Sequence, residues 1–253
     1  PVHVKIAPVD TANTGVYIAG TVEAPKPIQE SITDAGLVAS RIATFLKDPE
    51  IEIDLKTSKI NADVCIKCGT CADNCVYDAI DTTGEDFKVL DVSCQACGKC
   101  SVICPTGAID LQLYTEDQLI KQVDGILEQD PDSIIGYCCY QCGYNAADLA
   151  GTAKAFINPK VKVVLVPCSG RVTIQHMLYP FFKGAKGVFL AACLEGQCHY
   201  IDGNLQAKEK VKLAKKSLDL MGVGGRKLNL FNMSSAEGPK FVAAAKRMVE
   251  ICQ

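Results

Sequence analysis

The stretch CIKCGTCADNCVYDAID, from Cys65 to Asp81, returns almost unchanged as CQACGKCSVICPTGAID, from Cys94 to Asp110. The two segments align without a gap at an offset of 29 residues, so the chain contains an internal repeat. Each copy spaces its cysteines as C-x2-C-x2-C-x3-C, a pattern that wraps three thiolates around one inorganic cube. So small a repeat cannot fill a hydrophobic core, and we expect iron–sulfur clusters to supply much of its interior.

In this pattern the fourth cysteine of each run binds the cluster of the other run. The sequence therefore predicts two [4Fe–4S] clusters with crossed ligands. The first set is Cys65, Cys68, Cys71 and Cys104, and the second set is Cys94, Cys97, Cys100 and Cys75. Pro105 follows the last cysteine as the bacterial pattern expects, and Val76 replaces the other proline, which is not a ligand. Structural zinc typically uses separated cysteine pairs and does not explain this crossed repeat.

The composition excludes several classes of protein. The chain has 253 residues, 15 cysteines and a formal net charge of −3, and 48% of its residues are hydrophobic. This balance gives no reason to expect nucleic acid as a partner. No apolar run approaches the ~18–20 residues that span a bilayer, and no secretory or transit segment is visible, so we expect a cytoplasmic protein without a membrane span. Pro1 in place of Met is compatible with processing or with a piece of a larger polypeptide.

We expect a multidomain α+β and α/β protein with three parts, 1–55, 56–115 and 116–253. In the first part, Gly15–Val22 is predicted to be a buried strand, and Pro27–Leu46 is predicted to be a helix with Pro27 in its first turn. Lys47–Lys59 is predicted to be a charged linker. The second part is the two-cluster, ferredoxin-like repeat.

The third part alternates strand-like and helix-like segments, which predicts a short parallel sheet. Three predicted strands end on a cysteine, and the carboxyl ends of parallel strands are where α/β folds place their sites. The predicted strands are Ser133–Cys139, Val161–Cys168, Lys186–Cys193 and Lys227–Met233. The predicted helices are Ala146–Ile157, Val172–Phe182, Gly203–Met221 and a last helix for which Ser234 and Glu237 have capping-box spacing.

The cysteines of this third part predict a [2Fe–2S] site, which needs four ligands. The expected ligands are Cys139, Cys142, Cys168 and Cys193, with Cys198 as the alternative for the last. Two other interpretations are several buried thiols and a redox-active Cys139/Cys142 pair. A Rieske centre needs two histidine ligands in a suitable spacing, which His176 and His199 do not have, so His199 is expected near the site or on the surface. Cys138 and Cys252 fit small buried hydrophobes.

Three segments in order, GYCCYQCGYNAADLAG, VPCSGRV and ACLEGQCHYIDGN, resemble the delta subunit of methyl-viologen-reducing hydrogenase over about the last 120 residues. This resemblance implies a small [2Fe–2S] electron-transfer domain. The first half, with TGVYIAGTVEAPKPIQESITDAGLVASRIATFL, resembles the C-terminal part of the A subunit of heterodisulfide reductase. There the strand and helix close a thioredoxin-reductase-type FAD domain, which a two-cluster ferredoxin region follows.

The resemblance to a flavoprotein implies FAD contacts at Gly20, Thr21, Pro27 and Ile28. Related flavoproteins often carry Gly-Asp where this chain has Gly20-Thr21, and a helix beginning near Pro27 would turn its positive N-terminal end toward anionic groups. The G-x-G-x-x-G fingerprint is absent from the whole chain. FAD would therefore be shared with another chain or with a missing region.

The sequence thus indicates an electron-transfer subunit of an anaerobic flavoprotein complex like heterodisulfide reductase. Its electron partner would be a hydrogenase, a formate dehydrogenase or ferredoxin, and family analogy suggests flavin-based bifurcation. The fusion also resembles the B subunit of the quinone-interacting membrane-bound oxidoreductase. The alternatives are a thiol–disulfide oxidoreductase that uses Cys139 and Cys142, and a zinc-bound adaptor. No residue is expected to be catalytic in its own right.

Overall fold

The computed structural model describes residues 7–11, 15–47 and 56–253, and the chain divides into two compact units, Pro1–Ile53 and Asp54–Gln253. In the part that the structure describes, no helix combines the length and the apolar character that crossing a membrane requires.

The first unit contains the helix α1 (Ile28–Phe45) and, before it, the 3-10 turn η1 (Gly20–Val22). Pro27 is the N-cap of α1 and not part of its first turn. The helix predicted from the sequence is therefore confirmed to within one residue at each end. None of its residues is buried, and its apolar side chains are exposed, with Ile28 at 78% and Ile32 at 67%.

The buried strand predicted over Gly15–Val22 is wrong. Tyr17 forms one isolated antiparallel bridge with Asp10, and Val16 and Val22 are 52% and 80% exposed. An apolar run becomes a strand only where neighbouring strands take up its backbone hydrogen bonds. Here Gly20, with φ +66°, turns the chain into η1 instead. Most of the predicted linker, 48–55, lies outside the described residues.

The repeat folds as two copies of one strand–loop–helix–strand unit. The first copy is β1 (Ser58–Ile60), α2 (Thr70–Asp73) and β2 (Ile80–Asp81), and the second is β3 (Lys88–Val89), α3 (Lys99–Ile103) and β4 (Ile109–Leu111). β1 pairs antiparallel with β4, and β2 pairs antiparallel with β3. Each small sheet therefore takes one strand from each copy, so the two copies are interleaved. Gly69 and Gly98, at equivalent positions, have φ +78° and +72° and begin the two helices.

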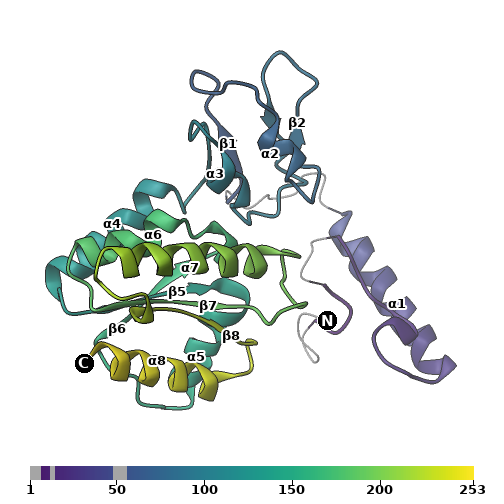
Figure 1. Ribbon diagram of the computed structural model, residues 1–253. Coiled ribbons are helices and arrows are strands. Elements are labelled where there is room, and N and C mark those ends of the chain that lie inside the picture. The colour runs from purple at the N-terminus through teal and green to yellow at the C-terminus, as the bar shows by residue number, and fades with distance from the viewer. Residues whose placement is uncertain (1–6, 12–14, 48–55) are drawn as a thin grey trace. The chain divides into compact units, whose positions relative to one another are not determined.

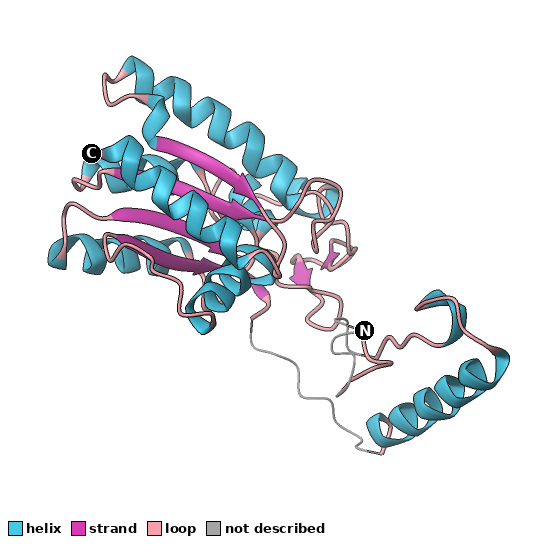
Figure 2. Ribbon diagram, turned by 90° about the horizontal axis from the view of Figure 1, so that it is seen from below, coloured by secondary structure: helices cyan, strands magenta, loops and turns pink. Residues whose placement is uncertain are grey.

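The C-terminal part contains a four-stranded parallel sheet in the order β6-β5-β7-β8 (Figure 2). Its strands are β5 (Ile134–Cys139), β6 (Val161–Val166), β7 (Gly187–Ala192) and β8 (Leu228–Asn232). All four predicted strands and the parallel sheet are thus confirmed. β6 ends two residues before Cys168, and β7 ends one residue before Cys193, so those two cysteines lie in the loops that follow.

Helices cover both faces of this sheet (Figure 1). One face packs against α4 (Glu116–Gln129), α6 (Ile174–Phe182) and α7 (Gly203–Leu220), and the other packs against α5 (Asn145–Thr152) and α8 (Gly238–Cys252). The four predicted helices are present, and α4 was not predicted. α8 begins at Gly238, where Glu237 accepts a 2.7 Å hydrogen bond from the amide of Ser234. Because both faces are covered, β5 and β7 are buried along their whole length.

One contact across the sheet makes a testable prediction about packing. A Cβ atom on Gly136 of β5 would lie 2.7 Å from Cε1 of Phe189 on β7, a fully buried ring that also contacts Phe231 and Phe241. We expect Gly136→Ala to lower the free energy of unfolding in urea by ~1–3 kcal/mol, because overpacking forces a core side chain to move. Phe189→Leu in the same chain should recover part of this loss.

Gly125→Ala in α4 is the matched control, because a Cβ there meets no atom within 4 Å. That substitution should raise stability by ~0.5–1 kcal/mol, since alanine loses less backbone entropy than glycine in a helix. Equal effects at the two positions would contradict the assigned packing of β5 against Phe189.

Candidate metal centres

Two cavities in the repeat are lined by cysteines. The cysteines around the first cavity are Cys65, Cys68, Cys71 and Cys104, and those around the second cavity are Cys75, Cys94, Cys97 and Cys100. The structure thus brings together each set of four that the sequence predicts, although the assignment of these residues as ligands remains a prediction.

The interleaved strands explain how each cavity receives a cysteine from the other copy. Cys75 follows α2 in the first copy yet lies in the second cavity, and Cys104 follows α3 yet lies in the first cavity. Both residues come just before a strand that pairs with the opposite copy. The crossing of the ligands is therefore a property of the backbone and does not depend on side-chain rotamers.

Local hydrogen bonds reach several of these sulfur atoms. Ala108 donates its amide N–H to Sγ of Cys104 at 3.2 Å, and the Ser58 hydroxyl lies 3.3 Å from Sγ of Cys100. Hydrogen bonds to sulfur stabilise the thiolate and tune the potential of a cluster. In the second cavity, burial raises the pKa of Cys97 to about 11 and that of Cys100 to about 12. Such buried thiols become thiolates only when a cation replaces their protons, so this donor set fits a metal cluster.

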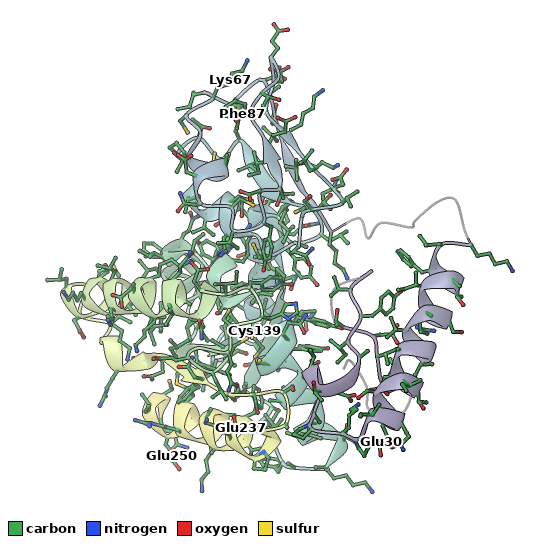
Figure 3. The ribbon with its side chains drawn as sticks, turned by 90° about the vertical axis from the view of Figure 1, so that its right-hand side faces the viewer. Glu30, Lys67, Phe87, Cys139, Glu237 and Glu250 are labelled. Atoms are coloured by element: carbon green, nitrogen blue, oxygen red, sulfur yellow. The ribbon has the colours of Figure 1, made fainter. Side chains whose placement is uncertain are left out.

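A third group of cysteines lies at the carboxyl edge of the parallel sheet. The sulfur atoms of Cys139, Cys142 and Cys193 all lie within 4.8 Å of one another, and those of Cys139 and Cys193 are 3.7 Å apart. Cys139 ends β5, Cys142 lies in the π-helical turn η2 (Tyr140–Tyr144), and Cys193 follows β7. The chain reverses its direction of winding between β5 and β7, and α/β folds bind ligands at such a point. Figure 3 labels Cys139, which lies between the two layers of helices.

These three thiols share their protons. Hydrogen bonds from Cys142 and Cys193 hold the pKa of Cys139 well below its usual range, and the amide of Gly143 donates to the same sulfur at 3.5 Å. The bond to Cys139 in turn raises the pKa of Cys142. The thiolate form of Cys139 is thus favoured, and two further sulfurs lie beside it. This group also fits a metal centre.

Cys168 and Cys198 extend this group on one side. Cys168 accepts the amide N–H of Gly170 at 3.3 Å, and a Cβ on Gly203 would lie 3.6 Å from Sγ of Cys198. A Cβ on Gly203 would overlap Sγ of Cys168, so a residue without a side chain is required there. Cys168, one of the expected ligands, and Cys198, the alternative to Cys193, therefore lie close to each other beside Gly203.

The remaining candidate residues have other surroundings. Cys138 is fully buried in the core on the α5–α8 face, and Cys252 is half-buried in α8. His199 is packed edge-on against Tyr200, and burial lowers its pKa. His176 is buried and completes a capping box with Thr173 at the start of α6, so its role is structural.

The four residues predicted to contact FAD gather around the start of α1. Gly20 lies close to Ser31 of α1, but its amide already donates to Asp34 at 3.1 Å. Thr21, Pro27 and Ile28 are all exposed. Because the amide of Gly20 is already bound to Asp34, this segment does not form a complete flavin site by itself.

Sequence reasoning missed two buried cations. Lys99 is 3% exposed and Arg171 is fully buried. Both stand within cysteine motifs, CGKC and CSGR, and a cation embedded in a ligand motif is a signal for which the sequence can be searched.

Comparisons with known proteins agree with these sites. A family model described as "Methyl-viologen-reducing hydrogenase, delta subunit" matches residues 134–253, and one described as "4Fe-4S binding domain" matches residues 90–110. The iron-sulfur D subunit of the F420-non-reducing hydrogenase vhu from Methanopyrus kandleri is 48% identical over 117 residues, 46% of this chain and 89% of that protein. Its counterpart from Methanocaldococcus jannaschii is 46% identical over 115 residues, 46% of this chain and 86% of that protein.

A longer relative covers nearly the whole chain. The A subunit of ferredoxin:CoB-CoM heterodisulfide reductase from Methanosarcina mazei is 33% identical over 241 residues, which are 94% of this chain. Those residues are only 30% of that protein, so the chain spans about a third of its length. In residues 134–253 the chain therefore belongs to the family of methyl-viologen-reducing hydrogenase delta subunits, and it joins this domain to a heterodisulfide-reductase-A-like region with a 4Fe–4S binding domain.

Proposed function

We propose that this chain relays electrons between a donor enzyme or ferredoxin and a flavin centre, as part of a complex like heterodisulfide reductase. The observation that carries the proposal is the presence of three cysteine groups in one compact unit, two around cavities in the repeat and one at the sheet edge. We propose two [4Fe–4S] clusters for the former and one [2Fe–2S] cluster for the latter. Such clusters supply one-electron transfer, and this chain's residues bind and insulate them.

The proposed order of the circuit follows the three parts of the chain, 1–55, 56–115 and 116–253. The donor, a hydrogenase, a formate dehydrogenase or ferredoxin, would dock at the C-terminal domain, because its third cysteine group lies at an edge with exposed aromatic rings. Tyr140 and Tyr144, on either side of Cys142, are 50% and 37% exposed. The names of the relatives include ferredoxin and hydrogenase, which supports these two as donors.

We propose that any FAD lies between this chain and another polypeptide or region that supplies most of the pocket. The first unit would contribute the N-terminal end of α1, where the helix dipole favours an anion. Flavin-based bifurcation, or delivery of electrons to a quinone, would then be a property of the assembled complex and not of this chain.

Metal content provides the first test. The chain, purified anaerobically, is expected to contain about ten iron atoms and about ten acid-labile sulfide ions, because two [4Fe–4S] clusters and one [2Fe–2S] cluster are bound. Iron and sulfide analysis, with EPR spectra recorded after reduction, measures this. Stoichiometric zinc with little iron would instead support a structural adaptor and contradict the proposal.

One observation favours a second function, a thiol–disulfide oxidoreductase. Cys139 and Cys142 are in C-x-x-C spacing, and hydrogen bonds from Cys142 and Cys193 lower the pKa of Cys139. However, Cys139 is only 1% exposed, so the disulfide of another protein cannot reach its sulfur. If the iron-free chain reduced a model disulfide, and Cys139→Ser abolished this activity, the second function would replace the first.

A further inference from the structure

Two buried cations connect the repeat to the C-terminal domain, and one comes from each of these two parts. Lys99, in the repeat, forms an ion pair with Asp202 and donates to the carbonyl oxygen of Tyr200 at 3.4 Å. Arg171, in the C-terminal domain, donates to Asp110 of the repeat at 3.0 Å and to the carbonyl oxygen of Tyr114 at 3.2 Å. Each of the two parts therefore supplies one cation to a carboxylate of the other part.

The backbone is shaped around these two side chains. A Cβ on Gly98 would lie 2.6 Å from Cδ of Arg171, and a Cβ on Gly170 would lie 3.3 Å from Cγ of Lys99. Gly98 also has φ +72°, which side chains rarely adopt. Each cation thus packs against a glycine that precedes the other cation in sequence. α3 and the 3-10 turn η3 (Ser169–Arg171) are in direct contact as a result.

The charges around this contact are matched. Arg171 also donates to Glu116 at 3.0 Å, so two carboxylates face its guanidinium. Asp202 receives a second hydrogen bond, at 2.7 Å, from Gln206. A buried cation whose partner is removed is strongly destabilising, and these partners belong to different parts of the chain. Separating the two parts would therefore take Asp202 from Lys99 and Asp110 from Arg171, and would leave Arg171 with Glu116 alone.

The contact is specific to the second cysteine run. Lys99 lies between Cys97 and Cys100, and the equivalent position in the first run is Thr70, whose hydroxyl is directed to Cys68 instead. Arg171 lies three residues after Cys168. Gly170, two residues after Cys168, packs against Lys99, the residue before Cys100, so the backbone beside Cys168 lies next to the second cysteine run.

We propose that Lys99 and Arg171 are positioning residues that hold the second cysteine run of the repeat against the C-terminal domain. Electrons from the third cysteine group would then reach the cluster of the second cavity before they reach the cluster of the first cavity. This rests on the proposed function. In that step a reduced third centre would give one electron to the second cube, and an external one-electron donor would then reduce the third centre again.

The test uses the full chain, loaded with iron and reduced stepwise with dithionite. Lys99→Met keeps the length of the side chain and removes its charge, and Lys99→Arg restores the charge. The matched control is Lys67→Met, a lysine in the first run that pairs with Asp86 and is about half exposed. Redox titration followed by EPR measures the potential of each centre, and hydrogen exchange measures the opening of segments 98–103 and 168–171.

Lys99→Met is expected to lower the potentials of the second cube and the third centre, because a positive charge that stabilises their reduced forms is lost. Hydrogen exchange in both segments should rise by about tenfold or more, because a buried ion pair no longer holds them together. Lys99→Arg should restore both quantities, and Lys67→Met should change neither.

Unchanged potentials and exchange in Lys99→Met, or equal changes in Lys67→Met, would overturn the docking proposal. Arg171→Met is a second test, because it should also raise hydrogen exchange in segments 98–103 and 168–171. A failure of the proposed function would show differently, as a wild-type chain without iron.

Discussion

Replacing Cys193 by alanine is expected to remove the iron of the third cysteine group and to stop reduction of the chain by its external donor. Cys193 is the expected last ligand of the group, and its sulfur lies 3.7 Å from that of Cys139 and within 4.8 Å of that of Cys142. Without it, the site loses one member of the triad of closely spaced sulfurs. About eight iron atoms should remain in the two cubes.

Cys138→Ala is the matched control for this variant. Like Cys193, Cys138 is a buried cysteine near the carboxyl end of a central strand. Its side chain, however, packs into the core on the α5–α8 face. Its replacement should cost some stability and leave the iron content and the rate of reduction unchanged. The measurements are iron per chain and the rate of absorbance bleaching by a low-potential donor. Full iron content in Cys193→Ala would show that the third group is not a metal centre of the kind proposed.

The sequence predicted the C-terminal sheet well because its signals are local and redundant. Each strand is a short apolar run between helix-length polar segments, and the first three runs lead into cysteines that the parallel topology brings to one edge. The same reasoning placed Cys139, Cys142 and Cys193 together. It also placed Cys168 in this group and left Cys198 open as the alternative to Cys193, because the position of Cys198 depends on how its loop folds at that edge.

The failures have equally specific causes. Gly15–Val22 has the composition of a strand, but only Asp10 pairs with it among the described residues. Helix α4 was missed although Thr115 and Gln118 form a capping box and Leu119, Val123 and Leu127 recur at helical spacing on its buried face. Lys99 and Arg171 could not be paired with Asp202 and Asp110, because those partners are 103 and 61 residues away in the sequence.

The second large effect concerns the crossed ligands of the repeat. Cys75→Ala is expected to damage the cluster of the second cavity, where Cys75 lies with Cys94, Cys97 and Cys100, although Cys75 belongs to the first run. Cys104→Ala, at the equivalent position of the second run, should damage the cluster of the first cavity. These two variants are controls for each other, because they remove the same chemical group from equivalent backbone positions.

Alkylation under native, anaerobic conditions identifies which cluster is lost, because a thiolate bound to iron is protected from the reagent. In Cys75→Ala, Cys94 and Cys97 should become reactive while Cys65 and Cys71 stay protected, and in Cys104→Ala the pattern should reverse. This outcome is expected because β1 pairs with β4 and β2 pairs with β3, which brings the fourth cysteine of each run to the cavity of the other run. If Cys75→Ala instead exposed Cys65, Cys68 and Cys71, each run would bind its own cluster, and the interleaving would have no consequence for ligation.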